Sequence, residues 1–115
     1  MQRSEIWTVA GGGDDTGKPR PLVIVQDGRF DGTDSITVCA LTTDRTDAPL
    51  FRIPVEPSET NGLDASSRIM VDKITTVRKS RLGVRLGRLD DEDAVRLNRA
   101  MVVFLGLASS PSTRS

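Results

Sequence analysis

Residues 17–26, "GKPRPLVIVQ", place Arg20 between Pro19 and Pro21, with Lys18 just before them, at the start of an apolar run. Proline fixes its own φ and pushes the residue before it into extended geometry, so the backbone of Arg20 has little freedom. A guanidinium held in this way can bind two oxygens of one phosphate group with its planar fork. The spacing therefore predicts an arginine that meets a particular anion.

The absence of histidine narrows the chemistry that such a site can perform. The chain of 115 residues has no histidine and one cysteine, Cys39, which lies in an apolar run. Serine and cysteine nucleophiles activated by histidine are excluded, and so are most transition-metal sites. We expect Cys39 to be buried and inert. Catalysis would have to come from Arg, Lys, Asp, Glu, Ser or Thr side chains.

The formal net charge of zero hides an uneven distribution of charge. Residues 1–72 hold seven Lys/Arg against twelve Asp/Glu, whereas residues 73–88 hold six Lys/Arg and no acid. A basic block in an acidic chain is typical of a surface that binds a polyanion. Solvated charges on alternate strand residues explain the same pattern equally well. With one Trp, three Phe and no Tyr, the chain is too poor in aromatic residues for a base-stacking platform.

The elements that must position these residues read mainly as strands. Apolar and β-branched runs bounded by Gly, Asp and Pro predict short strands, at residues 5–10, 21–26, 35–43, 50–55, 68–79 and 82–89. Pro54 indicates an edge strand or a bulge. The run 68–79 is expected to bend or split near Asp72 and Lys73. Thr42 and Thr43 come at the end of the third run.

The last part of the chain changes to a helical pattern. Asp90 as N-cap, three acidic residues after it and a helical spacing of apolar residues predict one amphipathic helix over 90–107, broken near Gly106. We expect a single domain over 1–108 and a disordered tail over 109–115. No apolar run approaches the roughly 20 residues that span a bilayer, and the start of the chain lacks a signal peptide. A cytoplasmic protein without a membrane segment is expected.

Several segments in this order resemble the MazF/PemK family of type II toxin–antitoxin ribonucleases, up to about residue 108. They are "EIWTV", "GKPRPLVIVQ", "VCALTT", "RIPVEP", "NGLDASSRIMVDKITTV", "LGRLDDED" and "VVFLGLA". The resemblance implies an SH3-like barrel of the CcdB/PemK-like kind with a C-terminal α-helix, paired as a homodimer. It also implies cleavage of single-stranded RNA, mRNA above all, at short sequence motifs without a metal or other cofactor. The products would carry 2′,3′-cyclic phosphate and 5′-hydroxyl ends. A cognate antitoxin would cover the RNA groove with an extended acidic C-terminal segment.

The resemblance also assigns roles to individual residues. It implies that Arg20 and Thr42 are catalytic and that Asp15 takes the place of an acidic loop residue that is often glutamate. It places Asp72 and Lys73 against RNA, with lysine where glutamine is more common. The further RNA contacts that we predict are Lys18, Thr43, Arg78, Lys79 and Arg81.

The proposed chemistry has simple requirements. Arg20 would stabilise the charge that grows on the phosphorane and could protonate the leaving oxygen, and Thr42 would add a hydroxyl donor. Arginine keeps its proton at ordinary pH and is a poor base, which leaves Asp15 as a conceivable base.

Alternative interpretations remain open on the sequence alone. Arg20 could be a turn arginine paired with Asp14 or Asp15, and Thr42 and Thr43 could be ordinary strand threonines. Related barrels also serve other purposes. One alternative is a gyrase-directed toxin that acts through its terminal helix and performs no chemistry. The other is an RNA-binding module that has lost catalysis.

Overall fold

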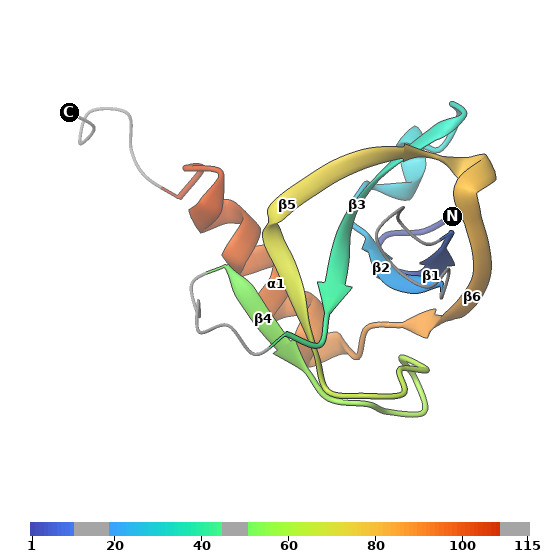
Figure 1. Ribbon diagram of the computed structural model, residues 1–115. Helices are drawn as coiled ribbons and strands as arrows, with labels where there is room; N and C mark the ends of the chain where they lie inside the picture. The colour runs from blue at the N-terminus through green and yellow to red at the C-terminus, as the bar shows by residue number, and fades with distance from the viewer. Residues whose placement is uncertain (11–18, 45–50, 109–115) are drawn as a thin grey trace.

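The computed structural model describes residues 1–10, 19–44 and 51–108. These residues form six strands and one α-helix: β1 (Glu5–Val9), β2 (Arg20–Ile24), β3 (Ser35–Thr42), β4 (Arg52–Val55), β5 (Ser67–Arg78), β6 (Leu82–Arg88) and α1 (Asp91–Phe104). Two short 3-10 helices lie between strands, at Gly28–Phe30 and Lys79–Arg81. The strands make one antiparallel sheet in the order β4-β5-β3-β2-β1-β6, and the sheet curls into a barrel-like shape (Figure 1). Helix α1 packs against β4 and β5. The predicted mainly β fold with a C-terminal helix is confirmed.

Two details of the strands agree with the sequence. Strand β4 lies at the edge of the sheet, where Pro54 costs no ladder hydrogen bond on its open side. Strand β5 is irregular where a bend was expected, because its register against β3 shifts: Cys39 pairs with Ile74 but Leu41 pairs with Ile69. Figure 1 shows β5 changing direction along its length. This bend lets a single long strand belong to two parts of the curled sheet.

The core lies on both sides of β2, as its continuous apolar run predicts. Val23 belongs to the cluster that packs between the sheet and α1, which also holds Cys39 and Leu97. Leu22 and Ile24 belong to a second cluster on the other face. Cys39 is fully buried, and burial raises the pKa of its thiol to about 11, so the thiolate that would be reactive does not form near neutral pH.

Helix α1 begins and ends where its sequence signals lie, but its cap is used differently. Asp90 occupies the N-cap position in extended geometry, yet its carboxylate makes no capping bond and instead accepts a hydrogen bond from Ser58 Oγ at 2.7 Å. At the other end Gly106 has a φ of 76°, and the N–H of Leu107 donates to Val102 O. This left-handed glycine stops the helix.

Two further expectations concern the C-terminal tail and the absence of a membrane-spanning segment. The tail over 109–115 lies outside the described residues. None of the helical segments that the structure describes combines the length and the hydrophobicity that a bilayer crossing requires.

Candidate functional site

A groove of about 560 Å³ opens where β2 begins and β3 ends. It is the larger of two neighbouring hollows, and parts of the chain that are far apart in sequence line it. The lining residues are Thr8, Pro19, Arg20, Pro21, Leu41, Thr42, Thr43, Gly62, Leu63, Asp64, Ala65, Ser67 and Leu86. Arg20, Thr42 and Thr43, which sequence reasoning selected, are all among them.

The register of β2 against β3 explains why Arg20 and Thr42 meet. The described ladder ends at the antiparallel pair Leu22–Ala40. The same register carried two residues further sets Arg20 opposite Thr42. Opposed residues of an antiparallel pair project from the same face of the sheet, with Cα atoms roughly 4.5–5.5 Å apart. This register agrees with the lining of the groove, in which both Arg20 and Thr42 take part.

Backbone contacts fix both members of the pair. On its other side the start of β2 is paired with β1, with Arg20 beside Val9 and Pro21 beside Thr8, while the Arg20 side chain is exposed. Thr42 Oγ1 accepts a hydrogen bond from the N–H of Asp44 at 3.1 Å. That contact orients the hydroxyl and leaves its proton to donate to a ligand.

The polar groups of the groove suit an anion. Among the described residues that line it, Arg20 is the one cation and Asp64 the one acid. The remaining polar side chains carry hydroxyls and belong to Thr8, Thr42, Thr43 and Ser67. A guanidinium with hydroxyl donors around it can bind the nonbridging oxygens of a phosphodiester. Within the described ranges no group of three or more His, Cys, Asp or Glu side chains could hold a metal ion.

One wall of the groove was missed by sequence reasoning. Residues 62–65 begin at the glycine of an Asn-Gly pair in the stretch between β4 and β5, which the sequence indicates only as rich in turns. A smaller hollow of about 40 Å³ shares Thr43 and Ser67 with the groove and extends to Arg68 and Glu56. The Asn-Gly pair was the available signal, since it marks a tight turn, but it does not show what the turn faces.

The pair Asp72 and Lys73 lies on β5, outside the groove lining. Arg52 holds the Asp72 carboxylate with two contacts, Nε to Oδ1 at 3.0 Å and Nη2 to Oδ2 at 3.3 Å. This hydrogen-bonded guanidinium lowers the pKa of Asp72 from its ordinary value. The Lys73 side chain is exposed. Asp72 therefore takes part in an ion pair within the sheet, and Lys73 remains available on the surface beside it.

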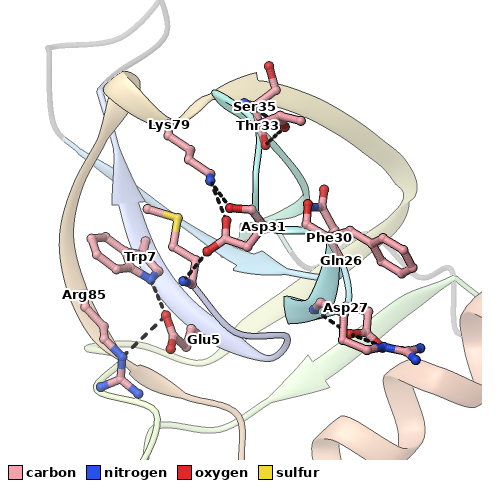
Figure 2. A network of polar contacts seen from close by, with 12 residues as sticks. Glu5, Trp7, Gln26, Asp27, Phe30, Asp31, Thr33, Ser35, Lys79 and Arg85 are labelled. Atoms are coloured by element: carbon pink, nitrogen blue, oxygen red, sulfur yellow. Dashed lines mark hydrogen bonds and ion pairs between the residues drawn. The ribbon is translucent and has the colours of Figure 1, made fainter.

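The basic residues of the β5–β6 connection lie at the other end of β3. Arg78 pairs with Ser35, and the eight residues of β3 separate that end from Thr42 by roughly 23 Å. Lys79 Nζ contacts Asp31 Oδ1 at 2.5 Å, and this contact lowers the pKa of Asp31 (Figure 2). Arg78 and Arg81 are exposed. The structure does not bring these three residues into the groove. Asp15 and Lys18 lie outside the described residues.

Sequence comparison supplies independent information on this chain. The family model described as "PemK-like, MazF-like toxin of type II toxin-antitoxin system" matches residues 2–105. A protein of Mycolicibacterium smegmatis described as "Probable endoribonuclease MazF" is 54% identical over 108 residues, which are 94% of this chain and 99% of that protein.

Solved structures give the same fold at lower identity. A mycobacterial endoribonuclease in complex with its cognate antitoxin superposes with a TM-score of 0.76 at 24% identity, covering 96% of this chain and 99% of that one. The Mycobacterium tuberculosis toxin MazF-mt6 has a TM-score of 0.73 at 22% identity and covers 89% of this chain and 96% of its own.

Proposed function

We propose that this chain, which belongs to the family of PemK-like, MazF-like toxins of type II toxin–antitoxin systems, is an endoribonuclease that cuts single-stranded RNA, mRNA above all. The observation that carries the proposal is that Arg20 and Thr42, from the ends of β2 and β3, both line one groove of about 560 Å³. The relative described as a probable endoribonuclease, 54% identical, supports the same activity.

The cleavage uses the RNA's own 2′-hydroxyl. That hydroxyl loses its proton and its oxygen bonds to the adjacent phosphorus, while the bond from phosphorus to the 5′-oxygen breaks and the 5′-oxygen gains a proton. The products are a 2′,3′-cyclic phosphate and a 5′-hydroxyl. Arg20 binds the nonbridging oxygens, on which negative charge grows, and Thr42 donates its hydroxyl to the same phosphate. One such donor stabilises a transition state by roughly 3 kcal/mol.

Proton transfers are assigned to the groups that can perform them. Arg20 donates toward the leaving 5′-oxygen, because a guanidinium is a donor at every ordinary pH. Asp15 is the proposed base for the 2′-hydroxyl. Asp64 is a second candidate, since it is the one acidic side chain among the described residues of the groove lining.

RNA on either side of the cut is held by further contacts. Thr43 lines both hollows, which supports the proposal that it contacts the nucleotide next to the cleaved phosphate. The other proposed RNA contacts are Lys18, Asp72, Lys73, Arg78, Lys79 and Arg81. Of these, Asp72 and Lys79 also belong to ion pairs within the protein.

The proposed partners are a cognate antitoxin and a second copy of this chain. The similar fold of a toxin solved in complex with its antitoxin supports the first. The end of α1 supports the second, because it exposes Val103, Phe104, Leu105 and Leu107, an apolar surface that a dimer would cover. The antitoxin would place an extended acidic C-terminal segment over the groove that holds Arg20, and the proposed location is the cytoplasm.

Incubation with RNA tests the proposal. Purified protein and its Arg20→Ala variant are mixed with a long, mixed-sequence single-stranded RNA in excess EDTA, and the fragment ends are mapped. Arg29→Ala is the matched control, because Arg29 is exposed and contacts Asp27 at the far end of β2. We expect discrete cuts with 5′-hydroxyl ends from the wild type and the control, and none from Arg20→Ala.

Two other results would contradict the proposal. Intact RNA across several substrates, together with inhibition of DNA gyrase supercoiling by the same protein, would establish the non-catalytic toxin. RNA that is bound with a steep salt dependence but stays whole would establish a binding module.

A further inference from the structure

Asn61 is a fully buried polar residue in the segment between β4 and β5. It does not line the groove, but the four residues that follow it, 62–65, do. Buried polar side chains in folded proteins are hydrogen-bonded, and a fully satisfied one specifies a single backbone arrangement around it. The contacts of Asn61 therefore decide what it fixes.

The Asn61 amide uses both of its polar atoms within its own segment. Oδ1 accepts hydrogen bonds from the N–H of Ser58 at 2.9 Å and from the N–H of Leu63 at 3.0 Å. Nδ2 donates to the carbonyl of Glu56 at 2.8 Å. The backbone N–H of Asn61 donates to Ser58 Oγ at 3.0 Å. The segment is folded around this one side chain, which ties the entry of the loop to the start of the groove wall.

The same segment is pressed directly against the backbone of β6. Gly62 has a φ of 68°, and a Cβ there would come within 2.2 Å of Leu86 O. A Cβ on Gly87 would come equally close to Thr60 O. The N–H of Arg88 donates to Thr60 O at 2.9 Å. The loop packs against β6 and is hydrogen-bonded around the Asn61 side chain, so its backbone conformation is fixed. Residues 62–65, which form the wall of the groove, are fixed with it.

We propose that Asn61 is a positioning residue: it holds residues 62–65 as a fixed wall of the groove and thereby sets how an RNA chain lies across Arg20 and Thr42. This inference rests on the proposed ribonuclease function. A displacement of about 1 Å in a group that positions a substrate can cost on the order of 100-fold in rate. An amide that never touches RNA can act on catalysis by this route.

Asn61→Asp gives a test that a merely structural role would not pass. Aspartate has nearly the same shape, and one of its oxygens can keep the bonds to Ser58 and Leu63. The other oxygen faces the Glu56 carbonyl, which it repels when ionised. When protonated it donates an O–H to that carbonyl, as the Asn61 amide does. The wall should therefore be restored at low pH and lost at high pH.

The surroundings of position 61 should raise the pKa of the introduced aspartate into the pH range of an RNA-cleavage assay. Burial raises the pKa of a carboxyl group, and neighbouring negative charge raises it further. The charged groups near position 61 are Glu56, Glu59, Asp64, Asp90 and Arg88. Four of the five are acidic, and the guanidinium of Arg88 already contacts Asp91. The pKa of the introduced aspartate should therefore lie well above the ordinary value of about 3.9.

The readout is the ratio of kcat/KM for the variant to that for the wild type, measured from pH 5 to pH 8. For Asn61→Asp we expect a ratio near one at the acid end that falls by on the order of 10- to 100-fold at the alkaline end. Asn61→Ala should be low at every pH, because it has no group to protonate. Leu97→Ala is the matched control: Leu97 lies on the buried face of α1, packs in the core and makes no hydrogen bond to these loop groups.

Amide hydrogen exchange of Ser58 and Leu63 reports the loop without RNA. We expect fast exchange in Asn61→Ala and pH-dependent loss of protection in Asn61→Asp after correction for the intrinsic rate. In Leu97→Ala the loss of protection should be no larger than its lower global stability accounts for. If the Asn61 variants do not fold, Ser58→Ala serves instead, since it removes the hydroxyl bound by the Asn61 N–H. It should show a smaller loss of the same kind.

The outcomes separate the two proposals. A wild type that leaves RNA whole contradicts the ribonuclease proposal, while the exchange data still decide whether Asn61 fixes the wall. A wild type that cuts, with an Asn61→Asp ratio that stays flat across pH and unchanged protection at Leu63, overturns the role of Asn61. A loss of cleavage that only follows the unfolded fraction, as in Leu97→Ala, overturns it as well.

Discussion

The two ends of β3 carry polar regions that are built in different ways. At the Ser35 end, charged groups contact each other: the Asp31 carboxylate binds Lys79 Nζ and the N-terminal ammonium of Met1 (Figure 2). At the Thr42 end, the groove holds one described cation among hydroxyls, and backbone features set the positions of its side chains. In the first region the charged groups form ion pairs within the protein. In the second, the charged side chain of Arg20 is exposed to a ligand in the groove.

This difference shows why a count of basic residues is a poor guide to a polyanion site. The block 73–88 holds six Lys/Arg and no acid. In the fold, Lys79 and Arg85 of this block approach Asp31 and Glu5, which are far away in sequence. Arg20 lies in the acidic part of the chain and yet is the cation of the groove. What marks Arg20 is rigid backbone, not local charge density.

Arg20→Ala should have the largest effect of the substitutions that distinguish the two regions. We expect kcat/KM for RNA cleavage to fall by on the order of 100-fold or more, because a donor to the developing charge is lost. The melting temperature should hardly change, since the side chain is exposed. Arg20→Lys should recover only part of the loss, because an ammonium cannot form the bidentate contact. If Arg20→Ala cleaved RNA at the wild-type rate, the groove could not be the catalytic site.

Thr42→Val sharpens the role of the second groove residue. Valine keeps the branched shape but has no hydroxyl, so one hydrogen bond to the phosphate is lost, worth about 1–1.5 kcal/mol. Single-turnover cleavage should slow by roughly tenfold. Thr75→Val, on the exposed side of β5, is the matched control and should cut at the wild-type rate. Equal slowing in both variants would indicate a general effect on the sheet.

Lys73→Gln tests the exposed cation next to the ion pair of Asp72. Loss of one phosphate contact should reduce the slope of log K against log salt for single-stranded RNA by roughly 0.7. Cleavage at saturating RNA should stay unchanged, because Lys73 does not line the groove. Binding measured by fluorescence anisotropy at several salt concentrations gives the slope. An unchanged slope would remove Lys73 from the RNA path.

The smallest effect concerns the acid stability of the ion-paired region. The pKa of Asp31 is lowered by Lys79 and that of Asp72 by Arg52, so each pair stabilises the fold above the ordinary carboxyl pKa. This stabilisation is lost as pH falls through the lowered pKa, over the range from about pH 5 downward. Asp31→Asn should therefore melt below the wild type at pH 7, and the difference should shrink as the pH falls below the ordinary carboxyl pKa. A difference that grew on acidification would contradict the sign of the shift.

Sequence reasoning reached the features that local chemistry determines. Apolar runs and turn residues predicted the strands, and the prolines around Arg20 marked a fixed arginine at the start of β2. Local sequence patterns did not predict which residues contact each other across long separations in the chain. Asp90 was expected to cap its own helix, but Ser58 binds its carboxylate across 32 positions. The groove wall after Asn61 depends on β6, which no local pattern of the loop encodes.

The burial of Cys39 has a practical consequence for labelling this protein. It is the one cysteine of the chain, its side chain is fully buried, and its thiol has a pKa of about 11. Maleimide reagents act on accessible thiolates, so the native thiol should stay unmodified near neutral pH. A cysteine introduced at an exposed site such as Glu59 would then carry a fluorophore or spin label at one defined place. Cys39 therefore does not have to be replaced before such a label is introduced.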